Sequence, residues 1–148
     1  MNLNLKNLKS KLLVFYKETL KFDFEASIQN DVLTLVHEGT RLNGISDDII
    51  IIASIYKDGA LNVRLVFDSL KDNMLEGLQL INVINMSNPF LRAFVNDNGL
   101  LVFDYTAINV IDDEQVIDNM RLILGYIASF EFIDLVRPIC NITKSITN

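Results

Sequence analysis

Few residues of this chain belong to the types that carry out catalysis. His37 is the only histidine and Cys140 the only cysteine among 148 residues. Acid–base or nucleophilic chemistry needs a second reactive group within hydrogen-bond reach of the first. Glu38 follows His37 directly, but adjacent residues of a strand point to opposite faces of the sheet. We therefore interpret His37 as a structural residue and expect no catalytic residues and no enzymatic activity.

The acidic clusters and the glycines give no sign of a metal or cofactor site. Residues 46–48 read Ser-Asp-Asp before an expected strand, and residues 112–114 read Asp-Asp-Glu before an expected helix. Acidic residues at a helix N-terminus are explained by capping and by the helix dipole. No set of ligand types has the spacing of a metal site. The glycines match neither a phosphate-binding loop nor a dinucleotide fingerprint, so we expect no metal and no cofactor.

Arg92 is the charged residue with the most distinctive expected surroundings. Aromatic residues Phe90, Phe94, Phe103 and Tyr105 belong to the same expected hairpin. These surroundings suit an arginine whose stem lies on apolar surface, and equally one that binds an acidic or aromatic partner. We favour the first interpretation and keep the second open.

Length and composition predict a single domain over residues 1–138, followed by a C-terminal tail over residues 139–148 that is expected to be poorly ordered. Half of the residues are hydrophobic and the mean hydropathy is +0.28. No apolar run approaches the ~20 residues that span a bilayer, so we expect no membrane insertion. The single cysteine fits a reducing compartment, and residues 12–16 are too short for a signal peptide. These features predict a cytoplasmic location.

The charge distribution argues against nucleic acid as a partner. The net charge is −6, whereas phosphate binding favours a basic surface. Residues 1–21 hold five lysines and one glutamate, so the remaining chain is strongly acidic. The basic segment could contact its own acidic body, a partner or an anionic surface. We favour a simple solvated helix face.

Alternating apolar residues around turn sequences predict three hairpins, over residues 22–38, 49–68 and 90–108. Their turns are expected to be two-residue turns at Asn30-Asp31, Asp58-Gly59 and Asn98-Gly99. For the first hairpin this register gives one apolar and one polar face. Its expected apolar face holds Phe22, Phe24, Ala26, Ile28, Leu33, Leu35 and His37.

In the other two hairpins both faces are largely apolar. The second is expected to place Ile50, Ile52, Ser54, Tyr56, Leu61, Val63, Leu65 and Phe67 on the core face. Its reverse face mixes Ile49, Ile51, Ala53, Ile55 and Val66 with Lys57, Asn62, Arg64 and Asp68. The third is expected to pair Val95 with Val102 and Phe94 with Phe103, which places Leu91, Ala93, Val95, Leu100, Val102, Asp104 and Thr106 on its second face. The second apolar face must be covered by the helix near residues 70–86, a second subunit or a client segment. The candidate partner-binding residues are therefore Phe90, Arg92, Phe94, Phe103, Tyr105, Ile49, Ile51 and Ile55.

Apolar residues at helical spacing predict three helices. The first covers residues 3–20. The second begins at the cap Ser69-x-x-Asp72 and ends near Met86, before Asn88-Pro89. The third runs from residue 112 to about Arg137, where Pro138 intervenes, and it is apolar nearly all round. The expected fold is α+β, with helices packed on a single antiparallel sheet in the order α-ββ-ββ-α-ββ-α.

The segment NVINMSNPFLRAFVNDNGLLVFDYTAINVIDDEQV, residues 82–116, carries a recognisable hairpin pattern. Its matching positions are Arg92, Ala93, Phe94, Asp97, Gly99, Leu101, Val102, Asp104, Tyr105 and 112–114. In these positions the chain resembles the YbjN-like family, small bacterial proteins described as sensory transduction regulators, which in fold resembles the class I type III secretion chaperones. The resemblance implies a compact α+β domain of chaperone-like fold, commonly dimeric, that binds another protein. It carries over no catalytic residues.

Two functions are consistent with these features. The first is a non-enzymatic protein-interaction module, chaperone-like or regulatory, that forms a homodimer and binds a protein segment on exposed apolar surface. The alternative is a small-ligand sensor domain with an apolar pocket between the sheet and the last helix.

Overall fold

The computed structural model describes residues 2–20, 23–40, 48–69, 74–88, 91–110 and 112–147. Its helices are α1 (Leu5–Phe15), which continues into the π-helical turn η1 (Tyr16–Leu20), α2 (Met74–Ser87), α3 (Asp113–Ile127) and α4 (Phe130–Thr147). Phe22, Phe90, Pro89 and residues 70–73 lie outside the described residues. Ser69, the expected cap of the second helix, is the last residue of a strand, and the described helix begins at Met74.

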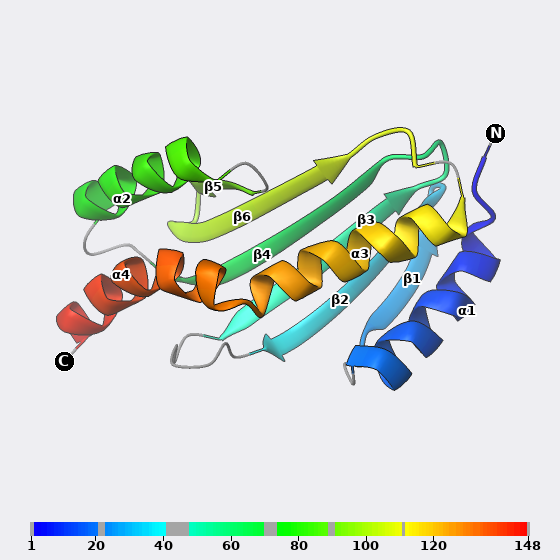
Figure 1. Ribbon diagram of the computed structural model, residues 1–148, viewed down its shortest axis with the longest axis horizontal. Coiled ribbons are helices and arrows are strands. Elements are labelled where there is room, and N and C mark those ends of the chain that lie inside the picture. Colours follow the sequence, from blue (N-terminus) through cyan, green and yellow to red (C-terminus); the bar gives the residue numbers. More distant parts are fainter. Residues whose placement is uncertain are drawn as a thin grey trace.

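The strands form one antiparallel sheet (Figure 1). They are β1 (Glu25–Gln29), β2 (Val32–Thr40), β3 (Ile49–Tyr56), β4 (Leu61–Ser69), β5 (Arg92–Val95) and β6 (Leu100–Ala107). The order across the sheet is β1-β2-β3-β4-β6-β5, and each neighbouring pair is antiparallel. The predicted α+β class with a single antiparallel sheet is confirmed.

The helices cover one face of this sheet. Figure 1 shows α3 running across the sheet, with α1 alongside β1, α4 continuing from α3 past the end of the strands, and α2 beside β5. The core lies between this helix layer and the sheet. Its helical members include Leu8, Leu12, Met120, Ile123 and Phe132, all with no exposed surface. We call this side of the sheet the helix face and the opposite side the open face.

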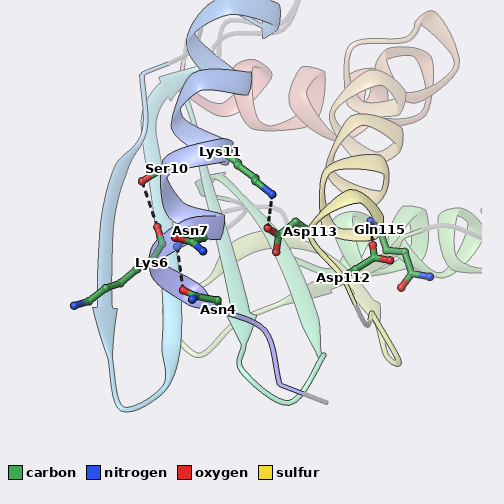
Figure 2. Close-up of polar contacts among 8 residues, drawn as sticks. All are labelled: Asn4, Lys6, Asn7, Ser10, Lys11, Asp112, Asp113 and Gln115. Atoms are coloured by element: carbon green, nitrogen blue, oxygen red, sulfur yellow. Dashed lines mark hydrogen bonds and ion pairs between the residues drawn. The ribbon is translucent and has the colours of Figure 1, made fainter.

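Polar contacts fix α1 against α3 and the end of the sheet. The Asn4 side chain caps α1 by accepting from the Asn7 N–H, and the Leu3 N–H donates to the Lys57 carbonyl at 2.9 Å. Lys11 Nζ pairs with Asp113 Oδ2 at 2.9 Å, across to the start of α3 (Figure 2). This contact raises the pKa of Lys11, because the carboxylate favours the charged amine. At least one N-terminal lysine therefore contacts the acidic body of its own chain.

The register predicted for the first hairpin is confirmed. Gln29 pairs with Val32 and Ile28 with Leu33, as a two-residue turn requires. Asn30 and Asp31 both have positive φ, at 52° and 62°, which is the conformation of a type I′ turn. Asparagine and aspartate tolerate this conformation better than other residues with a side chain.

The registers predicted for the other two hairpins are wrong by one residue. Ile55 pairs with Leu61, and Val95 pairs with Leu101. In both loops the glycine N–H donates to a carbonyl three residues earlier, Gly59 to Tyr56 and Gly99 to Asn96. Both glycines have positive φ, at 101° and 77°. Each loop is therefore a three-residue loop that ends in a glycine bulge, and not a two-residue turn.

A one-residue shift moves every side chain of a strand to the other face. Ile49, Ile51, Ala53 and Ile55 therefore lie on the helix face, with at most 1% of their surface exposed. Ile50, Ile52, Ser54 and Tyr56, expected in the core, lie on the open face. In the third hairpin Ala93 is opposite Phe103, while Arg92 and Phe94 lie on the open face opposite Asp104 and Val102.

The single long C-terminal helix that we predicted is wrong. Two helices meet at Ala128 and Ser129. Ser129 Oγ accepts from the Phe132 N–H at 3.3 Å, so this serine caps α4. α4 then continues through Pro138 to Thr147, so the predicted end at Arg137 is also wrong and residues 139–147 extend the helix. The carbonyl that Pro138 leaves without a helical donor belongs to Asp134, an exposed residue, and water can satisfy it.

The outer edge of β5 is closed by a side chain of α2. The Asn85 Nδ2 donates to the Ala93 carbonyl at 2.9 Å, and the Ala93 N–H donates to Asn85 Oδ1 at 2.7 Å. The amide of Asn85 thus replaces the neighbouring strand that β5 lacks on this side. Closing an edge in this way limits unwanted strand pairing.

Candidate functional site

The open face of the sheet carries a continuous row of apolar side chains. The register places Ile50 beside Val66, Val66 beside Val102, and Val102 beside Phe94. The row thus crosses β3, β4, β6 and β5. Ile52 and Val36 lie opposite each other in the next row. We call these six residues the open-face patch: Val36, Ile50, Ile52, Val66, Phe94 and Val102.

Most of this patch is only half-buried. Val102, at its centre, is 3% exposed, whereas the other five residues keep intermediate exposure. Val102 lies outside the core cluster formed by the helix face, so the sheet itself and its open-face neighbours bury it. Apolar side chains on the uncovered side of a sheet favour association with another surface.

A polar cluster borders the patch. Asn62 Nδ2 donates to Asp104 Oδ1 at 2.7 Å, and Arg64 Nε donates to the same oxygen at 3.1 Å. The Arg64 guanidinium carbon lies 6.0 Å from the centre of the Phe94 ring. The cluster compensates the Asp104 charge and holds Arg64 against the apolar row. A rigid polar border of this kind gives an apolar surface a defined orientation for a partner.

Arg92 lies at the β5 end of this border. It is exposed and is opposite Asp104 across the strand pair. Its backbone pairs with Asp104, whereas its guanidinium has no hydrogen bond or ion pair among the described residues. Its expected place beside Phe103 on one face is wrong, because Phe103 lies in the core.

The other candidate partner-binding residues separate into two groups. Phe94 lies in the open-face patch, whereas Phe103, Ile49, Ile51 and Ile55 are core residues on the helix face. Tyr105 also faces the helices, and its hydroxyl donates to Asn119 Oδ1 of α3 at 2.6 Å. Partial burial raises the pKa of Tyr105. Phe90 lies outside the described residues.

Sequence reasoning did not name Val36, Ile50, Ile52, Val66 or Val102 as candidate binding residues. It placed Val66 and Val102 on the second face of their hairpins, where the structure has them, whereas the one-residue register shift put Ile50 and Ile52 in the expected core. A glycine after Asp58 or Asn98 is equally compatible with a two-residue turn and with a three-residue loop ending in a bulge. The alternation of apolar residues could not choose between them, since both faces are apolar.

Aromatic side chains fill the space between the sheet and the C-terminal helices. The Phe103 and Phe132 ring centres are 5.1 Å apart, and Phe67 and Tyr126 contact the same cluster. The hollows lined by described residues lie at the margins of the sheet. One of about 390 Å³, for example, is lined mainly by polar residues of the segment before α1, by Lys11 of α1 and by the start of α3, including Asp113.

The histidine side chain, a common acid–base group, packs against the residues just before β1. His37 Nδ1 is 2.6 Å from the Asp23 carbonyl oxygen, and its ring centre lies 5.2 Å from that of Phe24. Within the described ranges, no three histidine, cysteine, aspartate or glutamate residues are grouped so that they could hold a metal ion.

The chain was compared with models of protein families, with curated proteins and with solved structures. No match is found in any of the three. In the part of the chain that the structure describes, no helix has the length and apolar character needed to cross a membrane. The open-face patch must therefore be assessed from its own geometry.

A second apolar surface lies on α2. Leu75, Leu78, Val83 and Met86 share its outer side and are between 41% and 88% exposed. Ile81 and Ile84 point inward and are buried. This surface is a single helix face without a polar cluster of its own.

The hydroxyl of Tyr16 is buried and has no hydrogen-bond partner among the described residues. Its ring stacks on Phe24, with centres 4.2 Å apart. Burial raises the pKa of this phenol well above its usual value of 10. Removing an unsatisfied buried hydroxyl is expected to be neutral or stabilising.

We expect Tyr16→Phe to raise the free energy of unfolding by about 1 kcal/mol at neutral pH. Burial raises the pKa of Tyr16 in the folded protein, so above pH ~10 the phenol ionises only in the unfolded chain. Ionisation of the unfolded chain lowers the free energy of unfolding of the wild type as the pH rises beyond ~10, and has no effect below it. The variant should lose less stability than the wild type above that pH. Urea unfolding curves at neutral and alkaline pH measure both effects. A destabilised variant would show that the hydroxyl has a partner.

Proposed function

We propose that this protein is a non-enzymatic protein-interaction module, chaperone-like or regulatory, whose open-face patch binds an apolar segment of another protein. The observation that carries the proposal is the continuous row Ile50–Val66–Val102–Phe94 on the side of the sheet opposite the helices. The helix face already has a complete core, so this second row is not needed to pack the helices. Binding of another protein accounts for it.

The resemblance of residues 82–116 to the YbjN-like family supports the same class of function. On that basis we also propose a homodimer and a cytoplasmic location. The single cysteine agrees with the latter.

The small-ligand alternative has less support. It requires an apolar cavity between the sheet and the last helix. The rings of Phe67, Phe103, Tyr126 and Phe132 occupy this region, with neighbouring centres 5.1–6.4 Å apart. No observation in the described part of the chain favours a ligand cavity there.

A charge placed in the open-face patch tests the proposal. Ile52→Asp puts a carboxylate in the patch, and Leu122→Asp puts one on α3, where Leu122 is 51% exposed. Both variants should remain folded, because neither site belongs to the core cluster, although aspartate in a strand costs about 1 kcal/mol. Circular dichroism checks the folding of each variant. Tagged wild type, Ile52→Asp and Leu122→Asp are used to capture proteins from native lysate, and the captured proteins are identified by mass spectrometry.

We expect wild type and Leu122→Asp to capture a common set of proteins that Ile52→Asp does not capture. An interaction through an apolar patch typically loses at least about tenfold in affinity when a hot-spot residue is altered. If the three forms capture the same proteins, the open-face patch is not the binding surface. Capture of nothing by any form under a range of salt concentrations would also contradict the proposal.

A further inference from the structure

The two edge strands of the sheet, β1 and β5, differ in the hydrogen bonding of their outward backbone groups. At β5, the Asn85 amide bonds both backbone groups of Ala93. At β1, no described residue bonds the outward backbone groups of the strand. β1 also has five consecutive regular pairs with β2, without the bulge that interrupts β2–β3 and β4–β6. Sheet edges that avoid pairing are usually covered, bulged, very short, charged or interrupted by proline. β1 is largely exposed, has no bulge or proline, and carries a single charged residue, Glu25.

The register shows which groups of β1 point outward. Gln29 and Val32 flank the two-residue turn and form its closing hydrogen-bonded pair. Hydrogen-bonded pairs then alternate along the ladder, so Ser27 and Glu25 also bond to β2. The N–H and C=O groups of Ala26 and Ile28 are consequently directed away from the sheet. They are available to another strand.

The sequence of β1 is complementary to itself. In an antiparallel pair of two β1 strands centred on Ser27, Ala26 is opposite Ile28 of the second copy, and Glu25 is opposite Gln29. The outward backbone groups then meet as hydrogen-bonded pairs. Within the five residues of β1 no two like charges are opposite each other, and the apolar side chains of Ala26 and Ile28 meet on the helix face. Ile28 is 36% exposed in the monomer and gains a neighbour.

We propose that β1 is the dimer interface of this protein, and that two copies pair through it into one continuous sheet. The inference rests on the homodimer of the proposed function and names its interface. Directly opposite residues of paired strands share a face, so the helices of both copies lie on the same side. The two open faces are then continuous, and the open-face patch of each copy stays accessible to a client segment.

Proline at position 28 tests the backbone pairing. Because the Ile28 N–H points outward, Ile28→Pro removes a bond to the second copy without removing one to β2, and proline is tolerated at such edge positions. Ile28→Val, which keeps the N–H, is the matched control. The dimer dissociation constant is measured by sedimentation equilibrium, with circular dichroism to confirm folding. We expect a dimer for wild type and Ile28→Val, and a dissociation constant at least about tenfold higher for Ile28→Pro.

A disulfide gives a second, independent readout. In a Cys140→Ser background, Ser27→Cys places two thiols opposite each other at the twofold axis, where Cα atoms of a non-hydrogen-bonded pair are about 4.5 Å apart. This separation allows a disulfide. Gln29→Cys is the control, because position 29 of one copy and position 29 of the other lie about 13 Å apart along the paired strands. We expect a disulfide-linked dimer under mild oxidation for Ser27→Cys and little for Gln29→Cys.

The outcomes separate the two proposals. A monomeric wild type that also fails to cross-link through Ser27→Cys overturns both the homodimer and its interface. A dimer that Ile28→Pro leaves unchanged, with equal cross-linking of the two cysteine variants, overturns only the β1 interface and directs attention to α2. Client capture through the open-face patch is measured separately and can succeed or fail in either case.

Discussion

Replacing Phe132 with alanine should lower the free energy of unfolding by about 3–5 kcal/mol. Phe132 has no exposed surface and joins α4 to the sheet through the aromatic cluster. Its ring centre is 5.1 Å from that of Phe103, at an interplanar angle of 75°, and 5.7 Å from that of Tyr126. Truncation removes these contacts and leaves a cavity that the rigid sheet cannot close. Urea unfolding monitored by circular dichroism measures the loss.

Phe130→Ala is the matched control for this prediction. Phe130 lies two residues earlier on the same helix and is 77% exposed. Its truncation should change the stability by less than about 0.5 kcal/mol. Equal effects of the two substitutions would mean that α4 does not pack on the sheet through Phe132.

Replacing Gly59 with alanine should destabilise the protein by roughly 2–6 kcal/mol, because backbone strain and overpacking each cost about 1–3 kcal/mol. Gly59 has a φ of 101°, which side-chain-bearing residues rarely adopt. A Cβ atom would also lie 2.7 Å from the Val110 backbone oxygen. The Val110 N–H donates to the Gly59 carbonyl at 2.9 Å, so the two segments cannot separate without losing this bond. Thermal and urea unfolding measure the effect.

Gly39→Ala separates the strain from the steric conflict. Gly39 has a similar positive φ of 76°, but nothing lies within 4 Å of its ideal Cβ position. Its substitution should cost only the strain, about 1 kcal/mol. If Gly39→Ala proves as harmful as Gly59→Ala, the close approach of the β3–β4 turn to Val110 is not what makes glycine necessary.

The three hairpins show how far strand register can be predicted from sequence. In the first, one face is apolar and the other carries Glu25, Ser27, Gln29 and Thr34. A shifted register would bury these polar groups, so the correct pairing could be predicted. In β3 the run Ile49–Ile52 is apolar on both faces, and either register buries similar side chains. There the turn decides the register, and a glycine is compatible with more than one turn.

The same ambiguity explains the errors in the candidate site. Arg92, Phe94 and Tyr105 were expected on one face with Phe103 because a two-residue turn was expected at Asn98-Gly99. The loop of three residues places Arg92 and Phe94 on the open face and leaves Phe103 in the core. The location of the hairpin was predictable from its alternation, whereas the orientation of its side chains was not.

By itself the sequence determined the α+β class, the three hairpins, the first register and the first two helices, because these follow from local periodicity and turn residues. The tertiary structure decided which side of the sheet the helices cover, where Ser129 divides the C-terminal helical segment, and which edge Asn85 closes. The first depends on contacts between residues far apart in the chain. The cap at Ser129 and the bonds of Asn85 to Ala93 are closer in sequence, but apolar periodicity does not reveal side-chain hydrogen bonds to the backbone. Where both faces of a strand are apolar, burial favours neither face locally, and only the packing of the whole helix layer determines which face becomes the core.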